Sequence, residues 1–189
     1  MADMAFKLEA APLLGGVEKE LAGCVLKERD DLVLVSLAVP REGMDPFSLA
    51  MVSGFGLELP SPTRSVEKDG FRLMQSTADS YLMIFAHPTP DAADAVKEKL
   101  GDTAYYTEQT DGWIRLELSG ARAREALERL CPLDLHDSAF PVGSNGRTSM
   151  EHMGTFIIRT DEESWLLLSL SSSGESFLHA VETSLKYIG

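Results

Sequence analysis

The order of expected secondary structure occurs twice along the chain, and this internal duplication constrains the fold most. In each half a strand is followed by a helix, a pair of strands and a second helix. The segment Asp79–Leu82 (DSYL) corresponds to Glu163–Leu166 (ESWL), and Leu57–Leu59 (LEL) to Leu133–Leu135 (LDL). Two copies are too few for a solenoid. They predict one duplicated α+β domain, residues 24–189, with helices against mostly antiparallel sheets.

The first half, about residues 24–101, begins with an apolar run typical of a buried strand. Asp45 and Pro46 suit the N-cap and first position of a helix, and Asp91 and Gly101 suit the two ends of another. The expected elements are strands at Leu32–Val39, Phe71–Gln75 and Ser80–Phe85 and helices at Phe47–Val52 and Asp91–Leu100.

The second half, about residues 102–189, repeats that order. Its last helix has a clean helical stripe, and Ser172 and Glu175 have capping-box spacing before it. We expect Trp113 and Trp165 to be mostly buried. The expected elements are strands at Trp113–Leu118, Arg147–Arg159 and Ser164–Leu170, with helices from Gly120 to Leu130 and from about Gly174 to Ile188.

Residues 1–23 have no clear period, and Gly15-Gly16 interrupts them. Two interpretations are open, a free tail or an arm that docks on another subunit. The segment carries apolar side chains, which favour docking because a free tail would expose them. These side chains are Phe6, Leu8, Leu13 and Leu14.

Composition and charge narrow the class of protein. Hydrophobic residues make up 44% and charged residues 25%, which is ordinary for a soluble globular domain. The net charge of −13 disfavours nucleic acid and anionic membranes as partners and could complement a basic partner face. Cys24 and Cys131 are far apart, and neither a signal peptide nor a membrane span is evident. We therefore expect a cytoplasmic protein with reduced thiols.

The residues themselves predict no catalytic, cofactor-binding or metal-binding site on this chain. The four histidines lack the spacing of a helical zinc site, and Gly54-x-Gly56 is typical of a helix end rather than a dinucleotide loop. Cys131 ends an amphipathic helix, where a cysteine is usually a small buried hydrophobe. Gly143–Arg147 fits either an anion-binding nest or a tight Asn-Gly turn, and we favour the turn, with Arg147 as a binding candidate.

A family resemblance appears in the second half. It is carried by Gln109–Leu135 (QTDGWIRLELSGARAREALERLCPLDL), by Phe140-Pro141 with Gly143, by Arg147-Thr148 and His152, and by the closing FIIRTDEESWLLLSL. These segments resemble the sarcosine oxidase gamma subunit family; the first half matches only in its order of elements. That family is in turn similar to the duplicated folate-binding domain of glycine-cleavage aminomethyltransferases. Met153 and Gly154 stand where those enzymes have an acidic pair.

The resemblance implies a structural, non-catalytic subunit in a heterotetramer with alpha, beta and delta partners. Such a complex oxidises the N-methyl group of sarcosine to give glycine and hydrogen peroxide, and it passes a one-carbon unit to tetrahydrofolate. The family places FAD, FMN, NAD, tetrahydrofolate and zinc on the partner subunits and none on this chain.

Two functional hypotheses follow. In the first the chain docks on its partners through residues 1–23 and the irregular segment 131–147, and the expected contacts are Cys131, Pro132, Arg147 and His152. In the alternative the chain is a stand-alone module that binds folate or another small anion. The candidate anchors of that anion are Arg115, Arg147 and Arg159.

Overall fold

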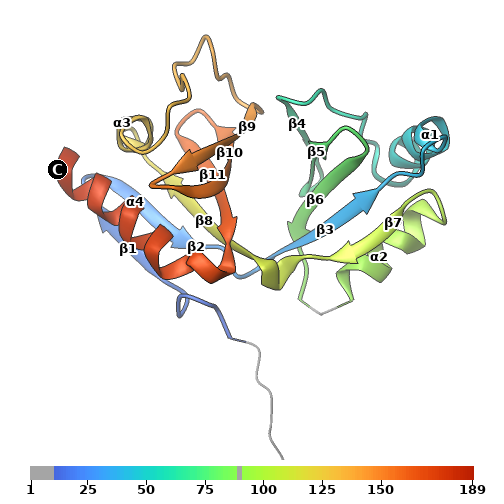
Figure 1. Ribbon diagram of the computed structural model, residues 1–189, viewed down its shortest axis with the longest axis horizontal. Coiled ribbons are helices and arrows are strands. Elements are labelled where there is room, and N and C mark those ends of the chain that lie inside the picture. Colours follow the sequence, from blue (N-terminus) through green and yellow to red (C-terminus); the bar gives the residue numbers. More distant parts are fainter. Residues whose placement is uncertain (1–10, 89–90) are drawn as a thin grey trace, which may run out of the picture.

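Two antiparallel sheets pack against each other at the centre of the computed structural model (Figure 1). The structure describes residues 11–88 and 91–189. A pair of helices covers one face of each sheet, so the molecule consists of two units, each a sheet with two helices. This arrangement confirms the predicted α+β fold with duplicated units and antiparallel sheets. Within the described residues, no helix is long and apolar enough to span a bilayer.

The first unit contains a five-stranded sheet in the order β4-β5-β6-β3-β7. Its helix α1 begins at Met44, one residue before the predicted N-cap Asp45, and Gly56 ends it in a left-handed conformation, as its sequence context predicted. The elements are β3 (Leu32–Ala38), α1 (Met44–Phe55), β4 (Ser65–Lys68), β5 (Phe71–Thr77), β6 (Ser80–Ala86), α2 (Ala92–Leu100) and β7 (Tyr105–Glu108).

The second unit contains a six-stranded sheet in the order β1-β2-β8-β11-β10-β9. The predicted capping box is not formed, because α4 begins at Gly174 without a side-chain cap. The elements are β1 (Glu18–Leu21), β2 (Cys24–Glu28), β8 (Trp113–Ser119), α3 (Ala123–Glu128), β9 (Asn145–Met150), β10 (Met153–Asp161), β11 (Ser164–Leu170) and α4 (Gly174–Ile188).

The two units exchange their leading strands. β2 directly precedes β3 but pairs with β8 of the second unit, with Val25 opposite Ser119. β7 directly precedes β8 but pairs with β3 of the first unit, with Val35 opposite Glu108. The halves 24–101 and 102–189 therefore each hold the same order of elements, while each sheet takes one strand from the other half. The sequence prediction missed both leading strands and their exchange.

The predicted boundary of the N-terminal arm at residue 23 is wrong. Glu18–Leu21 forms the edge strand β1, which pairs with β2. The buried carboxylate of Glu28 accepts hydrogen bonds from the backbone N–H groups of Leu14, at 3.0 Å, and Gly16, at 2.8 Å. Residues 14–21 therefore belong to the folded unit. The predicted docking residues Phe6 and Leu8 lie outside the described residues.

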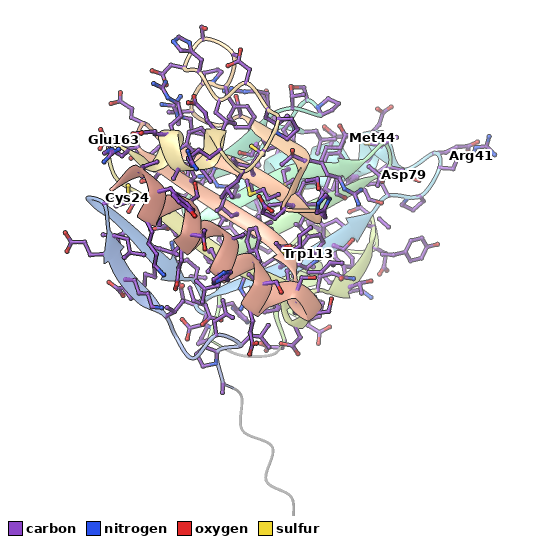
Figure 2. The ribbon with its side chains drawn as sticks, turned by 60° about the vertical axis from the view of Figure 1, so that its left-hand side comes forward. Cys24, Arg41, Met44, Asp79, Trp113 and Glu163 are labelled. Atoms are coloured by element: carbon purple, nitrogen blue, oxygen red, sulfur yellow. The ribbon has the colours of Figure 1, made fainter. Side chains whose placement is uncertain are left out.

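Apolar side chains fill three layers. One cluster lies between α1, α2 and the first sheet, and another lies between α3, α4 and the second sheet. The third lies between the two sheets, so β6 and β11 are buried on both faces, which explains their continuous apolar runs. Its buried members are Leu34, Met74, Leu82, Ile84, Phe156, Ile158, Leu166 and Leu168. The corresponding turn residues Asp79 and Glu163 lie at opposite sides of the molecule (Figure 2).

Local packing confirms most of the predicted core. Trp165 is buried and Leu127 is fully buried, with Leu130 and Leu133 packed against the same cluster. Trp113, however, is only partly buried, because it lies at the margin of the layer between the sheets.

One predicted strand is in fact a hairpin. Residues 147–159 divide at Glu151 and His152 into β9 and β10, with Met150 paired to Met153. Both turn residues have positive φ angles, 47° and 68°. The Asn-Gly signal usual in two-residue hairpins is absent from this turn, so the pattern did not reveal it. The predicted turn at Asn145-Gly146 is wrong, since both residues lie within β9.

Candidate functional site

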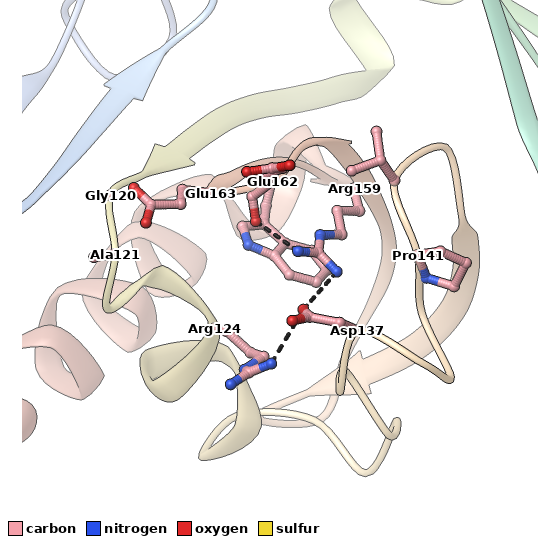
Figure 3. Close-up of a pocket in the computed structure, with 10 residues that line it drawn as sticks. Gly120, Ala121, Arg124, Asp137, Pro141, Arg159, Glu162 and Glu163 are labelled. Atoms are coloured by element: carbon pink, nitrogen blue, oxygen red, sulfur yellow. Dashed lines mark hydrogen bonds and ion pairs between the residues drawn. The ribbon is translucent and has the colours of Figure 1, made fainter.

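A polar cavity of about 530 Å³ opens between α3, the start of β11 and the irregular segment 131–144 (Figure 3). The wall carries charges of both signs. The lining residues are Gly120, Ala121, Arg124, Asp137, Pro141, Val142, Arg159, Glu162, Glu163 and Trp165. The family resemblance also points to this part of the chain, which makes the cavity a candidate site.

Arg159 is the central side chain of this cavity. It is only 6% exposed and lies over the ring of Trp165, with 5.3 Å between the guanidinium carbon and the ring centroid. Its guanidinium donates hydrogen bonds to the carbonyl oxygens of Phe140, at 3.0 Å, Asp161, at 3.3 Å, and Glu162, at 2.6 Å. A buried cation is tolerated because its donors are paired in this way.

Asp137 links Arg159 to α3. Its Oδ1 lies 2.8 Å from Nη1 of Arg159 and 3.1 Å from Nη1 of Arg124 (Figure 3). The hydrogen bond from Arg159 lowers the pKa of the Asp137 carboxyl below its ordinary value, and this effect outweighs the opposing effect of desolvation. The carboxylate therefore stays charged at neutral pH and holds the two arginines in place.

These contacts order the irregular segment 131–144. Leu135 and Phe140 are buried, and the ring of Phe140 stacks on Trp165 with 5.7 Å between centroids. At its far end the segment meets the first unit, where Arg64 donates to the Ser144 hydroxyl at 2.9 Å and to the Val142 carbonyl at 2.9 Å. These contacts tie the surface segment 131–144 to both units, through Phe140 on one side and Ser144 and Val142 on the other.

The four predicted partner contacts are not equally accessible. Cys131 is buried, at 7% exposure, and burial raises the pKa of its thiol, so it is unsuited to a partner contact in this conformation. Pro132, Arg147 and His152 are exposed. The guanidinium of Arg147 lies over the Phe156 ring at 5.6 Å.

The structure separates these contacts rather than gathering them. Gly146 faces Leu133, since a Cβ there would lie 3.0 Å from a Leu133 methyl group. Successive residues of a strand face opposite sides of the sheet. The neighbouring Arg147 therefore points away from the segment that holds Pro132.

The three candidate anion anchors do not converge either. Arg115 donates to the carbonyl oxygens of Arg29, Thr110 and Trp113, and burial lowers the pKa of its guanidinium. Strand alternation places Arg147 on the face of the second sheet toward the first, with Phe156, and Arg159 on the helix-covered face.

The suggested anion nest is also absent within the described residues. The N–H of Gly143 donates to the Arg159 carbonyl and that of Asn145 to the Thr63 carbonyl, both of which are backbone partners. Across residues 11–88 and 91–189, no three His, Cys, Asp or Glu side chains lie close enough together to hold a metal ion.

Sequence reasoning missed the Arg124–Asp137–Arg159 network. Strand alternation gave a usable signal, because Arg159 follows Ile157 on the helix-covered face, where a charged side chain needs a partner. Its partner Asp137 lies in an irregular segment. No periodic pattern in the sequence therefore predicts that these two residues form an ion pair.

Two solved structures have folds similar to this one. The structure of glycine cleavage system aminomethyltransferase T from Bartonella henselae superposes with a TM-score of 0.56 at 10% identity, over 88% of this chain and 53% of that one. A heterotetrameric sarcosine oxidase from Corynebacterium sp. U-96, in complex with pyrrole 2-carboxylate, contains a chain that superposes with a TM-score of 0.76. That match has 23% identity and covers 94% of this chain and 90% of that one.

The sequence then defines the family. The model of the sarcosine oxidase, gamma subunit family matches residues 41–184, so the chain belongs to that family. Sarcosine oxidase subunit gamma of Corynebacterium sp. (strain P-1) is 28% identical over 132 residues, which are 70% of this chain and 65% of that protein. The subunit gamma of an Arthrobacter species is 28% identical over 63% of this chain and 60% of that protein. The aligned region thus spans less than two thirds of these relatives.

Proposed function

We propose that this chain is the gamma subunit of a heterotetrameric sarcosine oxidase and that its role is assembly rather than catalysis. The observation that carries the proposal is the family match over residues 41–184. The likeness in fold to a chain of the Corynebacterium oxidase supports it. The network around Arg159 agrees with an assembly role, because the guanidinium donates its hydrogen bonds within the chain and holds a surface loop in place.

In this proposal the partners are the alpha, beta and delta subunits, and they carry FAD, FMN, NAD, tetrahydrofolate and zinc. The whole complex converts sarcosine to glycine and hydrogen peroxide and transfers the one-carbon unit to tetrahydrofolate. We place the complex in the cytoplasm, since Cys24 and Cys131 are both free and buried, in keeping with a reducing compartment.

Co-expression with the three candidate partners from the source organism tests the proposal. The purified chain alone is expected to be colourless and inactive with sarcosine, and the four-subunit preparation is expected to show a flavin spectrum and sarcosine-dependent oxygen uptake. Two results would contradict an assembly role: a flavin spectrum from the isolated chain, or full assembly and turnover when this chain is omitted.

The fold likeness to an aminomethyltransferase favours one second candidate, a module that binds folate or another small anion. Titration of the isolated chain with tetrahydrofolate separates the two. The assembly role predicts no saturable binding. The alternative predicts binding that Arg147→Ala weakens, whereas Arg122→Ala, a change at a partly exposed arginine, leaves it intact.

A further inference from the structure

A second cavity, of about 220 Å³, lies between the two sheets and is partly open to solvent. The first unit contributes Arg72 of β5 and Ile84 of β6 to its wall, and the second unit contributes Glu117 of β8 and Leu166 of β11. Sites between structural units commonly bind small molecules, and those for drug-sized ligands measure about 300–1,000 Å³. This cavity is smaller, so it has room only for a molecule of a few heavy atoms.

Arg72 is a cation in this wall whose donors are mostly without partners. It is partly buried, and its Nη1 donates a hydrogen bond to the Ser65 hydroxyl at 3.1 Å. Across residues 11–88 and 91–189 it forms no ion pair and no further hydrogen bond. Burial lowers the pKa of its guanidinium, against the attraction of Glu67. Because a guanidinium has five N–H donors and stays charged in proteins, several donors remain for another acceptor.

Three other arginines of the fold have acceptors within the chain. Arg159 and Arg115 each donate to three backbone carbonyl oxygens. Arg29, which lines the same cavity as Arg72, pairs with two carboxylates. Arg72 differs from all three, and a partly desolvated cation with one neutral acceptor loses free energy that a bound carboxylate would restore.

Two carboxylates line the same cavity, those of Glu67 and Glu117. Oε1 of Glu67 accepts a hydrogen bond from the N–H of Gly70 at 2.8 Å, and Oε2 of Glu117 accepts one from Arg29. Within the described part of the chain, the second oxygen of each carboxylate has no donor, and Glu67 forms no ion pair with Arg72, its neighbour across β4 and β5. The wall therefore presents donors and acceptors that are both without partners.

We propose that this cavity binds a small α-amino acid as its zwitterion, with the carboxylate on Arg72 and the ammonium group at Glu67 and Glu117. A guanidinium binds a carboxylate through two parallel hydrogen bonds, and an ammonium group has three donors for the glutamate oxygens. A simple anion is a poorer ligand because the glutamates repel it, and a simple cation is repelled by Arg72. This site goes beyond the proposed assembly role and does not depend on it.

Titration of the 189-residue chain with glycine, the smallest α-amino acid, tests the site. We expect saturable binding with a dissociation constant of about 1 mM or below. The NMR signal of the Gly70 amide should shift with the same constant, because its N–H donates to Glu67 in the cavity wall. Absence of saturation up to about 20 mM glycine would overturn the proposal.

Two further probes each retain one charged group of the ligand. Acetate lacks the ammonium group and methylammonium lacks the carboxylate, so each is expected to bind at least about tenfold more weakly than glycine. If either probe binds the parent as tightly as glycine, the zwitterion is not what the cavity recognises, and the proposal is wrong.

Substitutions separate the two ends of the site. Arg72→Gln removes the cation and is expected to weaken glycine binding at least about tenfold. Glu67→Gln keeps an acceptor for the Gly70 N–H but removes a negative charge, so it should weaken glycine binding and strengthen acetate binding. A merely structural role of Glu67 would not change the two affinities in opposite directions. The matched control Arg41→Gln, at an exposed arginine outside the cavity, should bind glycine like the parent.

A single cooperative thermal transition in each variant shows that its fold is intact. If Arg72→Gln does not fold, the comparison of glycine with acetate and methylammonium in the parent decides instead. A folded Arg72→Gln that binds glycine like the parent would overturn the site. That result leaves the proposed function standing, since co-expression with the partner subunits tests it separately.

Discussion

The two units have the same scaffold and opposite outer surfaces. In both, a helix follows the first strand and packs a buried apolar stripe against the sheet. The first unit turns Leu49 and Val52 of α1 toward solvent, whereas the second turns the ion-paired side chains of α3 outward. The fold fixes only the inner stripe of each helix. The outer faces of the two helices can therefore differ in charge while the fold stays the same.

A second difference concerns the connection after that helix. In the first unit it runs from α1 to β4 without a buried ion pair among the described residues. In the second unit the longer connection from α3 to β9 is tied to β10 by Arg159 and Asp137. The second unit therefore has a pH-sensitive ion pair that ties this connection to its sheet.

The largest expected effect tests whether the two units are stabilised alike. Phe177→Ala in α4 and Phe47→Ala in α1 each remove a fully buried ring, and each is expected to cost about 3–5 kcal/mol of unfolding free energy. Because the units exchange strands, urea unfolding followed by tryptophan fluorescence, which reports on the second unit, should coincide with unfolding followed by far-UV circular dichroism.

Two results would contradict the expectation that the two units are stabilised alike and unfold together. A loss below about 1 kcal/mol for Phe177→Ala would show that α4 is not packed as described. Transitions that separate between the two probes would show that the units unfold independently in spite of the exchange.

The next effect is specific to the second unit. Since the pKa of Asp137 is lowered in the folded state, its contribution to stability is complete above the ordinary carboxyl value of 3.8 and is lost as pH falls through the lowered pKa. The stability difference between the parent and Asp137→Asn should therefore be constant near neutrality and narrow below that value. Urea unfolding from about pH 6 to about pH 2.5 measures it.

Cleavage of the segment 131–144 by an acid protease should increase in the parent over the same low-pH range. It should be less dependent on pH in Asp137→Asn. A stability difference that stays constant down to the lowest pH would show that the ion pairs of Asp137 do not hold this segment.

The smallest effect compares two exposed cations that lie over rings. Arg147→Ala in the second unit and Lys99→Ala in the first are each expected to change unfolding free energy by no more than about 1 kcal/mol. Assembly with the partner subunits should nevertheless weaken in Arg147→Ala if this predicted contact is used. Equal assembly of parent and variant would remove Arg147 from the interface.

Local periodicity was enough to predict most of the elements. The apolar runs of β3, β6 and β11 and the helical stripe of α4 follow directly from residue spacing. The boundary errors arose where no local signal exists, as in the Glu151–His152 turn, which adopts positive φ angles without glycine or asparagine. The order of strands in the sheets was harder to predict, since no pattern within β2 specifies β8 as its neighbour.

The candidate sites show the same limit. Arg159 could be placed on the helix-covered face from strand alternation, but its partner Asp137 could not, because contacts from irregular segments depend on tertiary structure. In α1 the residue pattern predicts only a helix and its end. Recognising its exposed apolar side chains, Leu49 and Val52, required the structure, since the apolar residues alone do not reveal solvent exposure.

The exchange of leading strands has a consequence for synthesis on the ribosome. β2 leaves the exit tunnel long before β8, its neighbour in the sheet, has been translated, since Val25 pairs with Ser119. During that interval Cys24 and Leu26, which end in the core, have no sheet to join. Newly made chains therefore pass through a stage with an open, apolar strand edge, of the kind that chaperones bind and that aggregates when unprotected. Slowing translation between residues 28 and 113 should lengthen that exposure and lower the soluble yield.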